Sequence, residues 1–314
     1  MAAKFLMSIH PLLYATNSYF FQVFLIQRFL EMETHSSNSH FAIPKQPLGN
    51  GEPCYIAKSM PASNQESLSN ISVILVRTRS AGNIGSTARI LGNMGLRNLK
   101  LVQTTSSAED EARMMATSAH TILDQATQFE SLGEAGGEEH VLFGTTSGRD
   151  RRHSQPILSP RQAATRIVRI ARHHKVGLVF GPERSGMTVN ELSLCQNLIQ
   201  IPTDTAFPVL NVSKAVAIIC YEIAQYKGNP AGTIEPLIKI SDREEIYERM
   251  QRILMRIGFL SQSNPEHIMK ALRKILNQSE LSPRDGQIIR GIISQLEWYV
   301  DKGSRLDPKK VLKP

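Results

Sequence analysis

The sequence predicts an α/β fold in which a mainly parallel sheet is covered by helices and followed by a small all-helical extension. Two patterns predict it. From residue 71 to residue 226, short β-branched runs alternate with segments of helical pattern, as in parallel α/β sheets. From residue 242 to residue 299, apolar residues recur at helical spacing. The 314 residues are 41% hydrophobic and 20% charged, a composition that excludes disordered and membrane proteins and allows a sizeable core.

The predicted strands are short and apolar, which is typical of strands buried on both faces. Residues 71–76, with the sequence ISVILV, are the clearest example, and residues 176–180, VGLVF, are similar. The remaining strands are expected at 99–102, 141–145 and 198–201.

The predicted helices are delimited by capping residues. After a loop at 77–82, one helix ends near Gly95, because glycine is favoured just past a helix C-terminus. Ser159 and Pro160 begin another helix, which extends to His174. Further helices are expected within 108–129 and at 212–226.

The segment before this α/β domain, residues 1–70, differs from the rest in composition and hydrophobic pattern. Residues 11–30 are apolar-rich but interrupted too often for a membrane-spanning helix, and residues 34–70 are rich in Ser, Asn, Pro and Gly. We expect a disordered extension that carries no chemistry. The alternative is translated sequence upstream of the native start, with Met32 or Met60 as candidate starts.

The segment after the α/β domain, which we place at residues 71–228, begins with a Gly- and Pro-containing linker at 229–240. Residues 241–314 form the helical extension, in which two prolines mark helix starts and so define about three helices. These prolines are Pro265 and Pro283. The three cysteines, Cys54, Cys195 and Cys220, are too far apart for a disulfide framework or a zinc knuckle. They fit a reducing cytosol, so we expect a cytoplasmic protein.

The charge of the chain suggests a polyanionic partner. Lys and Arg number 36 against 28 Asp and Glu, a net charge of +8, and residues 149–175 alone carry +7. Such a block can bind an RNA backbone by neutralising phosphates, and the alternative is a solvated helix face balanced by acids elsewhere. The candidate RNA-binding residues are a loop trio, Arg149, Arg151 and Arg152, and a helix trio on one face, Arg166, Arg169 and Arg172.

The first of three specialised segments, residues 80–89, follows the first strand and reads SAGNIGSTAR. Gly82 and Gly85 stand at a helix N-terminus, where anion and nucleotide sites are often built. The spacing is not G-x-G-x-x-G, so a dinucleotide site is disfavoured. Arg89 follows one turn into the helix, and a surface arginine is its alternative reading.

The other two segments follow later strands, at the edge of the sheet where α/β proteins bind ligands. In residues 178–187, LVFGPERSGM, Glu183 could pair with Arg184 or Arg89, and a simple loop ion pair is the alternative. In residues 207–216, FPVLNVSKAV, Asn211 stands at a helix start and could act only as its cap.

Together and in this order, the three segments resemble the motifs of the SpoU branch of the SPOUT RNA 2′-O-ribose methyltransferases. The resemblance covers residues 71–226, and the helical tail is similar to the C-terminal extension of TrmJ-type tRNA (cytidine/uridine-2′-O-)-methyltransferases. It implies methylation of the ribose 2′-oxygen of a cytidine or uridine, at the first anticodon-loop nucleotide of tRNA. The alternatives are another tRNA position or rRNA, a non-catalytic RNA-binding protein of this fold and, last, a Rossmann-type nucleotide enzyme.

The resemblance also implies a C-terminal trefoil knot, a homodimer, S-adenosyl-L-methionine as cofactor and no metal. Asn83, Glu183 and Asn211 would organise the knot and the substrate pocket, and Arg89 matches the family's catalytic arginine. Because a guanidinium stays protonated, we expect Arg89 to hold the target phosphate and to stabilise the developing 2′-alkoxide. Val209 stands where many members have serine. The residues that would bind the cofactor are Thr146, Ser147, Gly148, Gly181, Ile201, Pro208, Val209 and Leu210.

Overall fold

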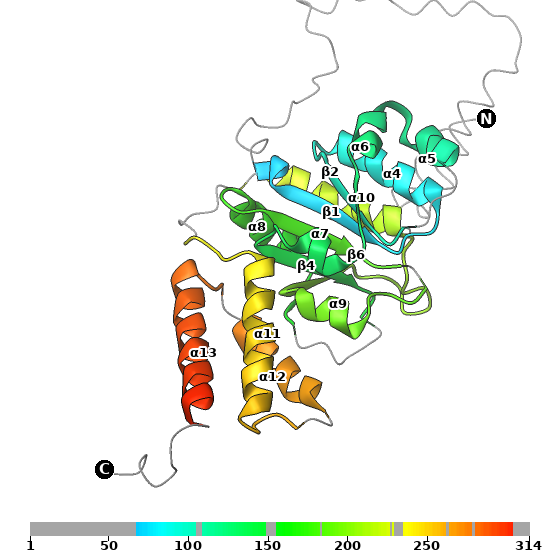
Figure 1. Ribbon diagram of the computed structural model, residues 1–314. Helices are drawn as coiled ribbons and strands as arrows, with labels where there is room; N and C mark the ends of the chain where they lie inside the picture. Colours follow the sequence, from blue (N-terminus) through cyan, green and yellow to red (C-terminus); the bar gives the residue numbers. More distant parts are fainter. Residues whose placement is uncertain are drawn as a thin grey trace, which may run out of the picture. The chain divides into compact units, whose positions relative to one another are not determined.

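A computed structural model of the chain describes residues 67–104, 109–148, 155–182, 184–226, 228, 235–261, 264–277 and 280–303. In these residues seven strands form one parallel sheet, in the order β3-β2-β1-β6-β4-β7-β5 (Figure 1). The predicted parallel sheet is thereby confirmed. Its strands are β1 (Ile71–Val76), β2 (Asn98–Val102), β3 (Thr127–Phe129), β4 (Val141–Thr146), β5 (Ile157–Leu158), β6 (Val176–Phe180) and β7 (Asn197–Gln200).

Both edge strands were absent from the sequence prediction. β5 has two residues and β3 three, too few for an apolar run to be recognised. Within residues 108–129, where helices were expected, the structure has short helices and a strand. The described part of the segment divides into α5 (Glu109–Ala116), a 3-10 turn (Thr117–Ala119), α6 (His120–Asp124) and β3. Thr117, with φ of 52°, has the left-handed backbone that interrupts an α-helix.

Helices cover both faces of the sheet, and side chains of the central strands alternate between two cores. On β1, Ile71, Val73 and Leu75 enter the core beneath α4 (Ala81–Asn93), α8 (Pro160–Ala171) and α10 (Val212–Gln225). Ile74 and Val76 enter the opposite core, which includes residues of α7 (Leu132–Gly136) and is flanked by α9 (Val189–Leu194). Burial on both faces accounts for the continuous apolar runs of the central strands.

The C-terminal extension consists of α11 (Ile240–Arg256), α12 (Pro265–Asn277) and α13 (Pro283–Gly303). Two of them begin at the prolines that predicted helix starts. The extension has apolar cores of its own, one of which contains Ile246, Ile253 and Ile293. Two backbone hydrogen bonds join the start of α11 to the residues before β4: Ile240 N donates to Glu139 O at 2.8 Å and Ser241 N to Gly137 O at 3.1 Å.

The folded domain begins slightly before the predicted boundary. Residues 1–66 lie outside the described residues, but Leu68 is buried and the Asn70 side chain donates to Ala171 O at 2.8 Å. Within the described ranges, no helix is long and apolar enough to cross a membrane.

Candidate active site

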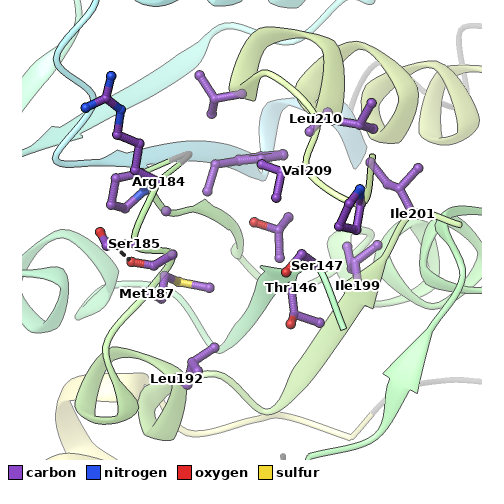
Figure 2. A pocket seen from close by; sticks show the side chains of 18 of the residues that line it. Thr146, Ser147, Arg184, Ser185, Met187, Leu192, Ile199, Ile201, Val209 and Leu210 are labelled. Carbon is purple, nitrogen blue, oxygen red and sulfur yellow. Dashed lines mark hydrogen bonds between the residues drawn. The ribbon is translucent and has the colours of Figure 1, made fainter. Parts of the chain in front are cut away.

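A cavity of about 300 Å³ opens at the carboxyl ends of β4, β6 and β7 (Figure 2). It is formed by the loops that follow these strands, with Val189 and Leu192 of α9 on one side. Of the eight residues expected to bind the cofactor, seven line it: Thr146, Ser147, Gly181, Ile201, Pro208, Val209 and Leu210. Gly148 is outside the lining, and with φ of +73° it forms the turn after β4.

The loop after β6 folds back against the end of its own strand. A Cβ on Gly181 would lie 2.7 Å from Met187 Cγ and 2.9 Å from Met187 N, so only glycine permits this approach. Gly186 has φ of +65°, and its N–H donates to Pro182 O at 2.9 Å. The two glycines that flank the Pro-Glu-Arg-Ser sequence therefore shape one wall of the cavity.

The chemistry of the lining fits S-adenosylmethionine. Phe180, Ile199 and Leu210 offer apolar surface for an adenine ring, and Ser147 and Thr203 offer hydroxyl groups. Arg184 supplies a cation suited to a carboxylate, and no residue of the described lining is acidic. S-adenosylmethionine is an amino acid joined to a nucleoside, so its adenine ring, ribose hydroxyls and carboxylate match these three kinds of group.

Asn83 and Asn211, which are 128 residues apart in the chain, are brought together by the fold: Asn211 Nδ2 donates to Asn83 Oδ1 at 2.9 Å. Asn211 also caps α10, since its Oδ1 accepts from Ser213 N at 3.0 Å. One asparagine thus caps a helix and joins the starts of α4 and α10.

Of the predicted catalytic residues that the structure describes, Asn83, Arg89 and Asn211, none is among the residues that line the cavity. Arg89 is exposed on α4 and makes no hydrogen bond or ion pair with any residue that the structure describes. Glu183 lies outside the described residues, as do Arg149, Arg151 and Arg152.

The helix trio was predicted to share one face and bind RNA, with pairing to acids elsewhere in the chain as the alternative, and two of its members do pair with an acid. Arg166 and Arg169 share the Glu280 carboxylate, with N–O distances of 3.0 and 3.3 Å, and Arg166 also donates to Asn197 Oδ1. The partner acid comes from the segment before α13. Arg172, at the C-terminal cap of α8, is partly buried and has partners of its own.

The glycines of the first motif serve packing. Gly82 and Gly85 are buried in α4 and face α5. A Cβ on Gly85 would lie 2.8 Å from the carbonyl carbon of Ala112 and closer still to its oxygen. The pattern interpreted as an anion site is therefore what allows the two helices to touch.

The two cysteines that the structure describes are buried. Burial raises the pKa of the Cys195 and Cys220 thiols to about 12, so both are protonated near neutral pH. Within the described residues, no group of three or more His, Cys, Asp or Glu side chains is placed to hold a metal ion.

Comparison with known proteins identifies two family regions. Residues 70–221 match the model of the SpoU rRNA methylase family, and residues 241–307 match that of the C-terminal domain of tRNA methyltransferase TrmJ. The tRNA (cytidine/uridine/adenosine-2′-O-)-methyltransferase TrmJ of Pseudomonas aeruginosa is 37% identical over 244 residues, which are 73% of this chain and 95% of that protein. The tRNA (cytidine/uridine-2′-O-)-methyltransferase TrmJ of Yersinia pestis is 34% identical over 238 residues, 73% and 92% of the two chains.

Solved structures agree with this assignment. TrmJ from Z. mobilis ZM4 superimposes with a TM-score of 0.65 at 29% identity, covering 72% of this chain and 98% of that one. A methylase family protein from Neisseria gonorrhoeae gives 0.54 at 27% identity, covering 61% and 97%.

Proposed function

The chain belongs to the SpoU methylase family and has a TrmJ C-terminal domain, and from this we propose that it methylates the ribose 2′-oxygen of tRNA with S-adenosylmethionine. The observation that carries the proposal is the cavity at the carboxyl ends of β4, β6 and β7. Its lining includes seven of the eight residues that the family pattern assigns to the cofactor. When bound, S-adenosylmethionine supplies a methyl group activated by a sulfonium, and the transfer needs no metal.

In this proposal, the residues of the cavity bind and orient the cofactor. Thr146 is the last residue of β4 and Ser147 follows it, and Pro208 to Leu210 precede the cap of α10, so both segments are anchored on buried elements. Arg184 would pair with the carboxylate of the cofactor. Val209, 41% exposed, would contact the cofactor through its backbone, which makes the loss of the serine hydroxyl harmless.

Arg89 would hold the phosphate of the target nucleotide and stabilise the charge that develops on the 2′-oxygen. Asn83 and Asn211 would fix the start of its helix, and Glu183 would organise the substrate side of the loop after β6. Aligning the oxygen with the methyl group and the sulfur is then the main catalytic task. The loop trio, Arg149, Arg151 and Arg152, would bind RNA beside the cofactor. Arg172 of the helix trio would bind RNA farther from the cofactor.

The finer assignments are also part of this proposal. The target is the first anticodon-loop nucleotide, a cytidine or uridine, and the enzyme acts in the cytoplasm as a homodimer with a trefoil knot. Exposed apolar residues on α10, Ile218 and Tyr221, support a subunit interface on that helix.

The test is transfer of radiolabelled methyl groups to unmodified tRNA transcripts. Label should enter a transcript with a cytidine or uridine at the first anticodon-loop position. It should not enter the same transcript with a 2′-deoxynucleotide there. Equal labelling of both would refute the ribose assignment, and preferential labelling of rRNA would refute tRNA as the substrate.

A further inference from the structure

Helix α9 separates two cavities and has no buried residue of its own. Val189 and Leu192 line the proposed cofactor cavity, whereas Glu191 and Ser193 line a second one of about 540 Å³. The far wall of the second cavity is formed by α11 and α12 of the extension. A six-residue helix is too short to be stable alone, so contacts from its neighbours must hold it in place.

One of these contacts comes from Arg77, directly after β1. Both terminal nitrogens of its guanidinium donate to the Glu191 carboxylate, and the Nη2–Oε2 distance is 3.0 Å. Two-pronged pairing fixes direction as well as distance. Arg77 has φ of 50°, a left-handed conformation that non-glycine residues rarely adopt, and its N–H donates to Val102 O at 2.8 Å. The backbone at the end of β1 is thus bent in a way that presents the guanidinium to α9.

Glu191 also contacts the end of the loop that lines the cofactor cavity. It is the third residue of α9, and its Oε2 accepts from Thr188 N at 2.6 Å while Thr188 Oγ1 accepts from Glu191 N. Thr188 ends the loop that begins at Gly181. Burial raises the pKa of Glu191, but hydrogen bonds from Arg77 and Thr188 outweigh it, so the pKa is lowered and the carboxylate is charged at neutral pH.

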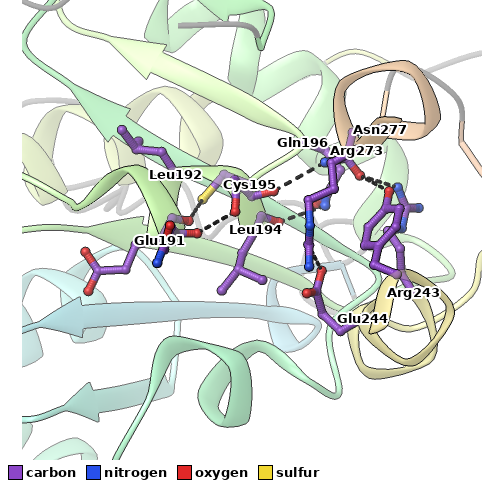
Figure 3. A network of polar contacts seen from close by, with 12 residues as sticks. Glu191, Leu192, Leu194, Cys195, Gln196, Arg243, Glu244, Arg273 and Asn277 are labelled. Carbon is purple, nitrogen blue, oxygen red and sulfur yellow. Dashed lines mark hydrogen bonds and ion pairs between the residues drawn. The ribbon is translucent and has the colours of Figure 1, made fainter. Parts of the chain in front are cut away.

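A second contact comes from the C-terminal extension (Figure 3). Asn277, the last residue of α12, donates from Nδ2 to Ser193 O at 3.3 Å. Its Oδ1 accepts from Arg243 Nη1 at 3.1 Å and from the Tyr247 hydroxyl at 3.0 Å. Arg243 is 2% exposed, so the amide of Asn277 is oriented by a buried cation.

We propose that Arg77 and Glu191 are positioning residues that hold α9 as a wall of the cofactor cavity, and that Asn277 couples the C-terminal extension to the same wall. The inference rests on the proposed function, because it assumes that the cavity binds S-adenosylmethionine. It assigns the extension an effect on cofactor binding, through a contact on the side of α9 that lines the second cavity.

The test is isothermal titration of the full chain with S-adenosylmethionine, together with hydrogen exchange of the α9 amides. Glu191→Gln keeps the shape of the side chain but removes its charge, and should weaken cofactor binding about tenfold and speed amide exchange in α9. Arg77→Lys should retain more cofactor affinity than Arg77→Gln, because lysine keeps the positive charge although it lacks the two terminal nitrogens of the guanidinium. Asn277→Ala should weaken binding less and should also speed exchange in α9.

The matched control is Glu297→Gln. Glu297 pairs with Arg249 at 2.8 Å, with side-chain exposures of 30% and 21%, between α13 and α11. This variant should bind the cofactor like the wild type. A wild type that does not bind S-adenosylmethionine would refute the proposed function. A wild type that binds it, with unchanged affinity and α9 exchange in Glu191→Gln and Arg77→Gln, would refute the positioning role alone. Unchanged behaviour of Asn277→Ala would refute the coupling to the extension.

Discussion

Gly85→Ala tests whether close contact between α4 and α5 shapes the first motif. A Cβ at this position would meet the backbone of Ala112, 2.8 Å from its carbonyl carbon and closer to its oxygen. Non-bonded carbon atoms are most favourable at about 3.5–4.0 Å, so the helices must separate by roughly 1 Å. A backbone carbonyl cannot rotate away as a flexible side chain would.

The magnitude follows from two opposing effects. Overpacking of this kind costs about 1–3 kcal/mol, whereas alanine in a helix is favoured over glycine by up to about 1 kcal/mol. We therefore expect Gly85→Ala to lower the free energy of unfolding by about 1–2 kcal/mol. Because α4 also carries Asn83 and Arg89, methyl transfer should fall as well.

The assay is urea unfolding, compared with the control Gly291→Ala. Gly291 is exposed on α13, and a Cβ there would meet no atom within 4 Å, so only the helix preference acts and the unfolding midpoint should rise slightly. A Gly85→Ala protein as stable as Gly291→Ala would refute the reasoning.

Three further predictions concern other parts of the chain. Arg89→Ala should reduce methyl transfer by on the order of 10² with unchanged cofactor affinity, and Arg89→Lys should rescue it poorly; near-normal turnover in the alanine variant would contradict the assignment. Removal of residues 1–65 should leave the melting temperature and methyl transfer intact, and loss of soluble protein would show that the segment is needed. Burial lowers the pKa of the His140 and His174 imidazoles below the unfolded value, and for His140 the neighbouring His174 lowers it further. The contribution of the neutral imidazoles to the free energy of unfolding is therefore complete above about pH 6.5 and is lost as pH falls toward the folded pKa. The melting temperature should therefore drop less between pH 7.5 and 5.5 in His140→Gln than in the wild type, and an equal drop would contradict the sign.

Local sequence predicted the elements whose residues are buried on both sides. The ISVILV and VGLVF runs gave β1 and β6 at their observed bounds, and Pro265 and Pro283 gave two helix starts. The short elements β3, β5, α7 and α9 were not predicted, because two to six residues are too few to show a hydrophobic periodicity.

The candidate site depended more on family resemblance than on periodicity. The resemblance indicated seven residues of the cavity lining, which no local pattern singled out. Contacts between distant residues were not predictable: Glu280 lies 114 positions after Arg166, and Glu191 lies 114 positions after Arg77. Nothing near Arg166 or Arg77 in the sequence identifies these partners, because only the fold brings them together.

Mass spectrometry of nucleosides from tRNA treated with the purified protein and S-adenosylmethionine tests the central claim most directly. The account predicts 2′-O-methylcytidine or 2′-O-methyluridine, located by nuclease mapping at the first anticodon-loop nucleotide, and little of either from the Arg89→Ala variant. Methyl groups found only on nucleobases, or no methylated nucleoside from a wild type that binds the cofactor, would contradict it.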